Sequence, residues 1–429
     1  MISINTLRQA IAESRQLSPV SFVKRLHYSA WLNKGADTNL IKVLTGFRRS
    51  GKSHLLKVFS QYLMTHAVAP ENIFFLNFEN DLLLTINTVK DLRHVWELYL
   101  AEIAIPGQPI YIIWDEIQLV ESWEKLVRTL YETGKYQINL SGSNSHLLSG
   151  ELSSSLSGRS LELTITPFSF VEYLEYLRLD RRNYYAHKQS IDRAFMRYLR
   201  RGGLPEQFDL DNDIAASYRE GLIQKIILDD IAKRYQIDKI NILQNLFQFI
   251  SGNITSTLSL RKIINRLQEQ GLEISPTTLD TYIYYWETSF ALSKLTKFDY
   301  RLSRVFDRTN KYYIVDNIFV PGRTESDEKR LENLVHMELV RRYGRRNVFF
   351  GSEANGYEVD FVVKQPRKLL AYQVCFELND MNFKRETGNL KLITKYTNSQ
   401  PAVLALRNES TIGSDIVIQP IIEWLLLAN

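Results

Sequence analysis

The chain has 429 residues, enough for roughly two to four domains, and its composition of 45% hydrophobic and 24% charged residues is that of an ordinary globular protein. It has no apolar run long enough to span a membrane, so we expect no membrane partner, and its single cysteine excludes an internal disulfide. The N-terminus shows no secretion pattern, which predicts a cytoplasmic protein, and the net charge of +5 permits contact with nucleic acid without requiring it.

Residues 1 to about 38 have the apolar spacing of amphipathic helices and end in a polar turn. Arg25 lies in this segment, shortly before the first glycine-rich motif. Two interpretations are open: contact with a nucleotide, or simple exposure to solvent. The second is favoured because most isolated charges are exposed.

Residues Gly46 to Ser53 match the phosphate-binding loop pattern G-x-x-x-x-G-K-[ST] at every fixed position. A β-rich run, Ile41–Thr45, precedes them, and apolar residues with helical spacing follow to about His66. A strand, a glycine loop and a helix N-terminus together present backbone N–H groups to phosphate oxygens. We therefore predict that the following residues bind ATP or GTP: Gly46, Arg48, Arg49, Ser50, Gly51, Lys52, Ser53 and His54.

Within this loop two side chains have predicted chemical roles. Lys52 should reach the β- and γ-phosphates, and the Ser53 hydroxyl should bind Mg²⁺. The seven histidines show no metal-ligand spacing, so Mg²⁺ carried with the nucleotide is the metal we expect.

A second β-rich run, Ile73–Phe78, and a helical segment of about 89–104 lead to an uninterrupted apolar strand that ends in Asp115 and Glu116. Such a run is typical of a strand buried on both faces of a parallel sheet, where ligands bind at the carboxyl ends of the strands. This is the Walker B pattern. Asp115 should hold the Mg²⁺, and Glu116 should act as the general base that polarises the attacking water.

A helix over about 122–133 and a strand at 136–140 end in the polar residues 141–144. Ser143 or Asn144 either senses the γ-phosphate or forms a turn, since both residue types favour turns. Arg159 precedes a strand at 161–166. It is a candidate arginine finger, acting on the nucleotide of its own chain or of a neighbour, although an isolated arginine is more often solvated.

Several motifs, in this order over nearly the whole chain, match one family: residues 46–53, 114–117, 141–144, 158–159, 167–170, 202–206, 331–335 and 358–361. On these residues the sequence resembles prokaryotic AAA+-type P-loop ATPases that have a C-terminal domain of restriction-endonuclease-like type. The resemblance implies an α/β fold. A parallel P-loop NTPase sheet with helices on both faces would be followed by a helical and winged-helix region and a small α/β nuclease-like domain. It also implies ATP rather than GTP.

We accordingly expect an ATPase core at 1–170, a helical linker domain at 171–255, a winged-helix-like unit at 256–322 and a nuclease-like domain at 323–429. In the linker domain a cluster of arginines is interleaved with acidic residues, which favours a solvated helix face over a DNA contact: Arg178, Arg181, Arg182, Arg193, Arg197, Arg200 and Arg201.

The winged-helix-like unit should contain a helix at 259–269, a second one capped by Ser275, and a hairpin pairing 292–298 with 311–316. The second helix has no Lys or Arg, so DNA contact would fall to the basic hairpin residues: Lys294, Lys297, Arg301, Arg304, Arg308 and Lys311. A packing or protein-contact role is the alternative.

In the last domain Glu332 and Asp360 fit the metal ligands of a nuclease core. Gln373 stands where the second strand should carry an acid, and Cys375 where it should carry a lysine. An amide and a thiol supply neither the negative charge nor the ammonium, so we expect a degenerate, inactive site formed by Glu332, Asp360 and Gln373.

Three functions follow from these patterns. The first is a Mg²⁺-dependent ATPase that couples hydrolysis to conformational change in its C-terminal modules, as a homo-oligomer if Arg159 acts on a neighbouring chain. The second is a nucleotide-gated switch that binds DNA or protein with little turnover. The third, and least favoured, is a DNA nuclease.

Overall fold

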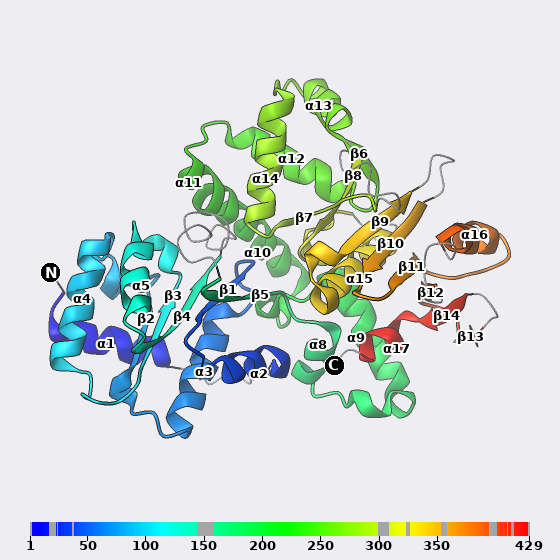
Figure 1. Cartoon of the computed structure of the whole chain (residues 1–429). Coiled ribbons are helices and arrows are strands. Elements are labelled where there is room, and N and C mark those ends of the chain that lie inside the picture. Colours follow the sequence, from blue (N-terminus) through cyan, green and yellow to red (C-terminus); the bar gives the residue numbers. More distant parts are fainter. Residues whose placement is uncertain are drawn as a thin grey trace. The chain divides into compact units, whose positions relative to one another are not determined.

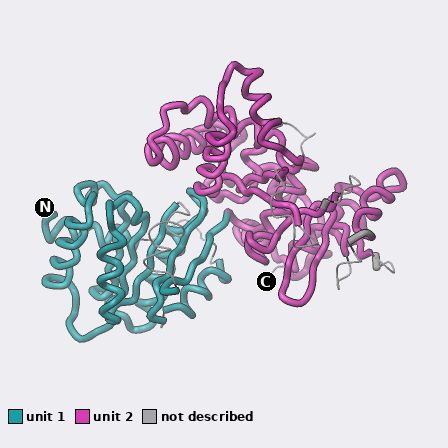
Figure 2. Tube along the Cα trace, turned by 45° about the horizontal axis from the view of Figure 1, so that its top comes forward, with its two compact units in different colours: residues 1–166 teal, residues 167–429 magenta. Residues whose placement is uncertain are grey.

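The computed structural model describes residues 2–16, 23, 25–36, 38–143, 158–298, 309–322, 327–352, 358–393, 401–409, 411–412 and 416–427. Contacts divide the chain into two compact units, residues 1–166 and 167–429 (Figure 2). Four residues named above lie outside the described part of the chain: Asn144, Arg301, Arg304 and Arg308. The finer division of the chain after residue 170 stays a prediction.

The first unit contains a sheet of five parallel strands in the order β2-β3-β4-β1-β5 (Figure 1). The strands are β1 (Ile41–Gly46), β2 (Ile73–Asn77), β3 (Ile110–Asp115), β4 (Tyr136–Gly142) and β5 (Ser160–Ile165). Because the strands are parallel and β4 lies between β3 and β1, the residues that follow these three strands meet at one edge of the sheet.

Helices cover both faces of this sheet, as predicted. They are α1 (Ile4–Arg15), α2 (Leu26–Gly35), α3 (Lys52–Thr65), α4 (Val89–Glu102) and α5 (Trp123–Glu132). The side chains of β3 alternate between two apolar cores: Ile112 and Trp114 pack with residues of α1, α4 and α5, whereas Tyr111 and Ile113 pack with residues of α2 and α3. The continuous apolar run in β3 therefore reflects burial on both faces.

The second unit begins with helices, as the apolar spacing predicts. They are α8 (Phe170–Tyr176), α9 (Lys188–Arg201), α10 (Asn212–Lys225), a π-helical segment (Ile226–Ala232), α11 (Lys233–Tyr235) and α12 (Ile240–Gly252). No helix of the described residues has the length and apolar character to cross a membrane.

A three-stranded antiparallel sheet with two helices follows. Its elements are β6 (Thr257–Ser259), α13 (Leu260–Glu269), α14 (Pro276–Thr288), β7 (Leu292–Leu295) and β8 (Thr309–Ile314), with the strand order β6-β8-β7. The predicted helices and hairpin are confirmed. Ser275 caps α14 because its hydroxyl accepts a hydrogen bond from the Thr278 N–H at 3.1 Å.

The chain ends in a six-stranded mixed sheet of order β13-β14-β12-β11-β10-β9. Its elements are α15 (Asp327–Tyr343), β9 (Val348–Ser352), β10 (Glu358–Lys364), β11 (Leu369–Cys375), α16 (Phe383–Ile393), β12 (Ala402–Ala405), β13 (Thr411–Ile412), β14 (Val417–Pro420) and α17 (Ile421–Leu426). Strands β9, β10 and β11 are antiparallel neighbours, and β12 returns parallel to β11 after α16. Asp360 and Gln373 therefore lie on adjacent strands.

Candidate nucleotide-binding site

The loop between β1 and α3 has the backbone geometry that its glycines require. Gly46 has a φ of 142°, and a Cβ at this position would lie 2.1 Å from the carbonyl oxygen of Ile165. Gly51 has a φ of 97°, in the left-handed region that side chains disfavour. The helix that follows begins at Lys52, so its free N–H groups face the loop.

The Lys52 side chain is buried and turned into this loop. Its ammonium donates to the carbonyls of Gly46 and Phe47, at 3.1 and 3.2 Å, and lies 3.5 Å from Oε1 of Glu116. A cation is thereby held directly beside the Glu116 carboxylate, which follows β3.

Asp115 is fully buried at the end of β3. Its Oδ1 accepts a hydrogen bond from the Ser141 hydroxyl of β4, whereas Oδ2 accepts none from any described residue. Burial, and then the neighbouring charge of Glu116, raise its pKa to about 6, while contact with the hydroxyls of Ser141 and Ser53 and the charge of Lys52 act in the opposite direction. A buried carboxylate oxygen without a donor, with the Ser53 hydroxyl nearby, fits the oxygen ligands that Mg²⁺ prefers.

Glu116 follows with a φ of 55°, a left-handed conformation that is uncommon for glutamate and turns its carboxylate toward the loop. Besides the Lys52 contact, its Oε2 accepts hydrogen bonds from the Gln118 side chain and from the Ser143 N–H, the latter at 3.2 Å. Burial alone would raise the pKa of Glu116, but the Lys52 charge and the Gln118 hydrogen bond outweigh it and lower the pKa.

Arg25 is buried, so the favoured expectation of a solvated side chain is wrong. Its guanidinium donates to the carbonyl of Ser50 in the loop at 2.7 Å and to the carbonyl of Thr166 at 2.8 Å, and it lies 4.5 Å from the ring centre of Tyr28. The planar fork of arginine suits two such acceptors at once. No sequence pattern signalled this role, because both partners are backbone carbonyls.

The other predicted loop residues differ in exposure. Arg48 makes a salt bridge of 2.9 Å with Glu79, and Arg49 is exposed with a φ of 64°. Ser50 is buried. His54 is partly buried, and burial, followed by the charges of Lys57 and Arg25, lowers its pKa.

Sequence reasoning also missed Ser141 and Gln118. The Ser141 hydroxyl donates to the Asp115 carboxylate and also accepts from the backbone N–H of Glu116 at 3.2 Å. Gln118 reaches the Glu116 carboxylate from the turn after β3. A polar residue ending β4 beside a Walker B strand was the available signal for Ser141. Gln118 had none, because its contact depends on the turn geometry.

The structure does not bring Arg159 to this site within one chain. Ile41 and Ser160 are paired at the start of β1 and β5, and the Ile41 N–H donates to the Arg159 carbonyl. The loop begins at the opposite ends of these strands, roughly 16 Å away for five residues of strand. Arg159 instead lies 3.7 Å from Glu132.

Five of the seven arginines in the cluster of the second unit are exposed, as a solvated face requires: Arg178, Arg182, Arg193, Arg197 and Arg200. Five of the guanidinium groups also bind within the unit: Arg181 to the Leu426 carbonyl, Arg182 to Asp180, Arg197 to the Phe208 carbonyl, Arg200 to Asp327, and Arg201 to the Leu210 carbonyl. Lys311 of the hairpin, in contrast, has a side chain only 1% exposed and is unavailable to DNA.

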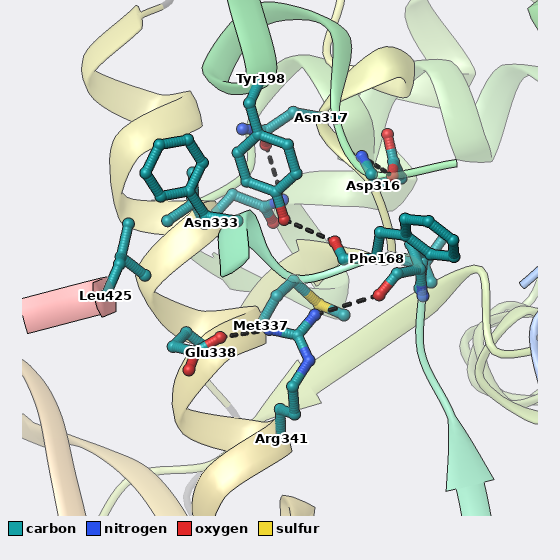
Figure 3. Close-up of a pocket in the computed structure, with 15 residues that line it drawn as sticks. Phe168, Tyr198, Asp316, Asn317, Asn333, Met337, Glu338, Arg341 and Leu425 are labelled. Carbon is teal, nitrogen blue, oxygen red and sulfur yellow. Dashed lines mark hydrogen bonds and ion pairs between the residues drawn. The ribbon is translucent and has the colours of Figure 1, made fainter. Parts of the chain in front are cut away.

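The second unit also contains a pocket of about 30 Å³, where the turn Gly202–Gly203 meets Asp316 (Figure 3). The Gly203 N–H donates to Asp316 at 2.7 Å, and the Tyr198 hydroxyl donates to the Phe168 carbonyl at 2.7 Å. This volume holds a water molecule or two and no nucleotide. The glycine motif at 202–206 therefore has a packing role.

The residues of the predicted degenerate nuclease site do come together. Glu332 and Asp360 both lie close to the Lys311 ammonium, at 3.2 and 3.4 Å, and the Gln373 side-chain oxygen accepts from the Asp360 N–H at 3.3 Å. Burial, and next the charges of Glu386 and Asp360, raise the pKa of the Cys375 thiol to about 12. Across the described residues, no group of three or more His, Cys, Asp and Glu side chains could hold a metal ion.

The similarity of this chain to known proteins agrees with the P-loop fold of the first unit. A family model described as an AAA domain matches residues 38–174, and one described as a domain of unknown function matches residues 192–320. An uncharacterized protein of Haemophilus influenzae is 32% identical over 95% of this chain and 99% of its own length. An uncharacterized protein of Methanocaldococcus jannaschii is 31% identical over 81% of this chain and 77% of its own length.

Among solved structures, a Walker-type ATPase of Pyrococcus abyssi is 16% identical, with a TM-score of 0.49 over 72% of this chain and 98% of its own. The AAA match, the strand order and the loop define an AAA-type P-loop ATPase domain in the first unit. The chain belongs to the family of the Haemophilus influenzae and Methanocaldococcus jannaschii proteins.

Proposed function

We propose that this protein is a Mg²⁺-dependent ATP hydrolase that couples turnover to conformational change in its second unit. One observation carries the proposal: the buried Asp115 carboxylate has an oxygen without a donor in the described chain, beside the Ser53 hydroxyl and near the Lys52 ammonium. A carboxylate that can bind a metal, a lysine ammonium that can bind phosphate and the N-terminus of a helix thus lie at the same edge of the sheet.

The roles of the side chains follow from this arrangement. Ser53 and Asp115 would hold Mg²⁺, which when bound neutralises charge on the phosphate oxygens. Lys52 would leave the Gly46 and Phe47 carbonyls to contact the β- and γ-phosphates. Glu116 would accept a proton from the attacking water, and its lowered pKa keeps it ionised for that task.

Arg25 supports the coupling part of the proposal. It binds Ser50 in the loop and Thr166, the last residue of the first unit, after which the chain continues into the second unit at Pro167. A shift of the loop on nucleotide binding would therefore act on the start of the connecting segment. Coupling requires such an element that responds to both sites.

The test is hydrolysis by Glu116→Gln. We expect at least roughly 100-fold lower kcat with ATP binding retained, because general-base catalysis contributes on this order. Glu121→Gln, at an exposed acidic position nearby, is the matched control and should hydrolyse ATP like the parent. Turnover of Glu116→Gln at the parental rate would exclude the general-base role.

A nucleotide-gated switch with little turnover is the second candidate, and the contacts of Glu116 favour it. Both oxygens of this carboxylate are engaged, one facing Lys52 and the other accepting from Gln118 and the Ser143 N–H. A base held in this way acts only after rearrangement. Saturable ATP binding with background hydrolysis in the parent would support the switch over the hydrolase.

Arg159 can serve as an arginine finger only on a neighbouring chain, which would make the active form a homo-oligomer. Its side chain is 40% exposed, as a contribution to another subunit requires. Mixing Arg159→Ala with Lys52→Ala protein tests this role. Under the proposal the mixture recovers activity, because each mixed interface can join an intact loop to an intact arginine.

Contact with DNA remains a weaker proposal, since Lys294 and Lys297 are the described hairpin cations outside the buried cluster at Lys311.

A further inference from the structure

Four charged side chains meet between the three-stranded sheet and the C-terminal sheet of the second unit. The Lys311 ammonium, from β8, lies 3.2 Å from Glu332 on α15, 2.7 Å from Glu358 and 3.4 Å from Asp360, both on β10. The Lys311 side chain is 1% exposed, whereas that of Glu358 is 37% exposed. The cluster is therefore a built and nearly closed ionic site.

The nuclease-like arrangement of α15, β9, β10 and β11 would imply a divalent cation at this place. The donor set does not fit one. Gln373 is neutral, and its side-chain oxygen already accepts from the Asp360 N–H. The second oxygen of Asp360 accepts from the Val374 N–H at 2.9 Å, and Glu332 also accepts from the Tyr313 hydroxyl at 2.7 Å. The carboxylates are thus already satisfied by protein donors.

We propose that the Lys311 ammonium takes the place of the divalent cation, so that the former metal site is an ionic link between β8 and the C-terminal sheet. The inference is independent of the ATPase proposal, because all of its residues lie in the second unit. Two features support it. An ammonium provides three donors for three surrounding carboxylates, and a lysine stays this deeply buried only when it is paired.

A consequence is that removal of Lys311 should restore a cation site. Lys311→Ala leaves Glu332, Glu358 and Asp360 around a space that one ammonium had filled. Carboxylates without a counter-charge in a buried site repel one another, and an added divalent cation relieves that repulsion. The variant should be less stable than its parent, and Mn²⁺ should stabilise it again.

The experiment uses the full chain without nucleotide in a Ser53→Ala background, which removes the hydroxyl proposed for Mg²⁺ in the first unit. Bound Mn²⁺ is counted by electron paramagnetic resonance, and thermal unfolding is followed with and without Mn²⁺. We expect Lys311→Ala to bind one Mn²⁺ more than its parent, to unfold roughly 10 °C lower without metal and to recover with it. Lys294→Ala, which removes a hairpin lysine outside the cluster, should match the parent.

Two further variants decide the outcome: the double variant Lys311→Ala/Asp360→Asn and the single variant Asp360→Asn. Adding Asp360→Asn to Lys311→Ala should abolish the extra Mn²⁺, and a Lys311→Ala protein that gains none overturns the proposal. Should Lys311→Ala fail to fold, Mn²⁺ is counted on the parent with and without Asp360→Asn. Equal counts support the proposal. Loss of one Mn²⁺ on Asp360→Asn, or plasmid cleavage by the parent that Asp360→Asn removes, overturns it.

Discussion

Arg25 donates a hydrogen bond of 2.7 Å to the carbonyl of Ser50, and so a residue far upstream of the phosphate loop anchors that loop. The same guanidinium holds Thr166 on the other side. The shape of the loop thus depends on a side chain that cannot itself reach a phosphate without giving up these partners.

Replacing Arg25 by alanine should weaken both the first unit and its nucleotide binding. Two buried carbonyls lose a charged donor, which we expect to cost about 3 kcal/mol of unfolding free energy. ATP affinity should fall roughly tenfold, equivalent to about 1.4 kcal/mol. Calorimetric titration with ATP and thermal unfolding measure the two effects. Arg8→Ala removes an exposed arginine of α1 and should change neither. Unchanged affinity in Arg25→Ala would show that the loop holds its shape alone.

Ser141→Ala should reduce the Mg²⁺-dependent part of nucleotide binding. The Ser141 hydroxyl donates to Asp115, and loss of a partner that orients a metal ligand typically weakens metal binding roughly 10–100-fold. The measurement compares ATP affinity with Mg²⁺ and with chelator. Affinity in chelator should be nearly unchanged. Ser217→Ala, at an exposed serine of α10 in the second unit, is the control and should leave both affinities unchanged. An equal loss in both conditions would argue against a metal role for Asp115.

Gly203→Ala should destabilise the second unit. A Cβ on Gly203 would lie 2.2 Å from the Phe168 carbonyl oxygen, so backbone must move, and overpacking of this kind costs about 3 kcal/mol at the upper end of its range. This lowers the unfolding temperature by roughly 6–12 °C. Gly221→Ala, in helix α10 with no atom within 4 Å of the added Cβ, should instead stabilise by roughly 0.5–1 kcal/mol. Equal effects of the two substitutions would contradict the packing role of the 202–206 motif.

His336 should make the second unit acid-sensitive. It is buried against Tyr313, its ring centre 4.1 Å from that of the tyrosine, and burial, followed by the charge of Arg345, lowers its pKa to about 3. The unfolded chain binds a proton at this residue near pH 6.5 and the folded chain does not, so stability is lost as the pH falls from about 6.5 toward 3.

The size of this effect can be compared between two variants. Between pH 7 and pH 5 the parent should lose about 2 kcal/mol more than His336→Gln. Hydrogen exchange of α15 peptides, read by mass spectrometry, isolates this unit from the first. His94→Gln, at an exposed position of α4, should follow the parent. Identical pH profiles for parent and His336→Gln would remove His336 as the cause.

The sequence predicted those parts of the molecule in which one residue type suits one backbone geometry. The glycines of the phosphate loop, the buried run of β3 and the Ser275 cap are of this kind, and all three elements are present. Contacts that join distant segments were not predictable. Arg25 binds carbonyls, which any residue supplies, and Lys311 meets Glu358 only because β8 packs against the C-terminal sheet. For Arg159 the sequence left open whether it acts on the nucleotide of its own chain or of a neighbour, because only the strand register places it at the end of β5 away from the loop.

Cys375 has a practical consequence. At neutral pH a thiol with a pKa near 12 is almost wholly protonated and reacts slowly with alkylating dyes, whereas an exposed cysteine has a pKa of about 8.5. Thiol-reactive dyes should therefore label the native chain very little. A fluorophore pair on two introduced surface cysteines, one in each unit, could then follow the relative motion of the units during ATP turnover without removal of the natural cysteine.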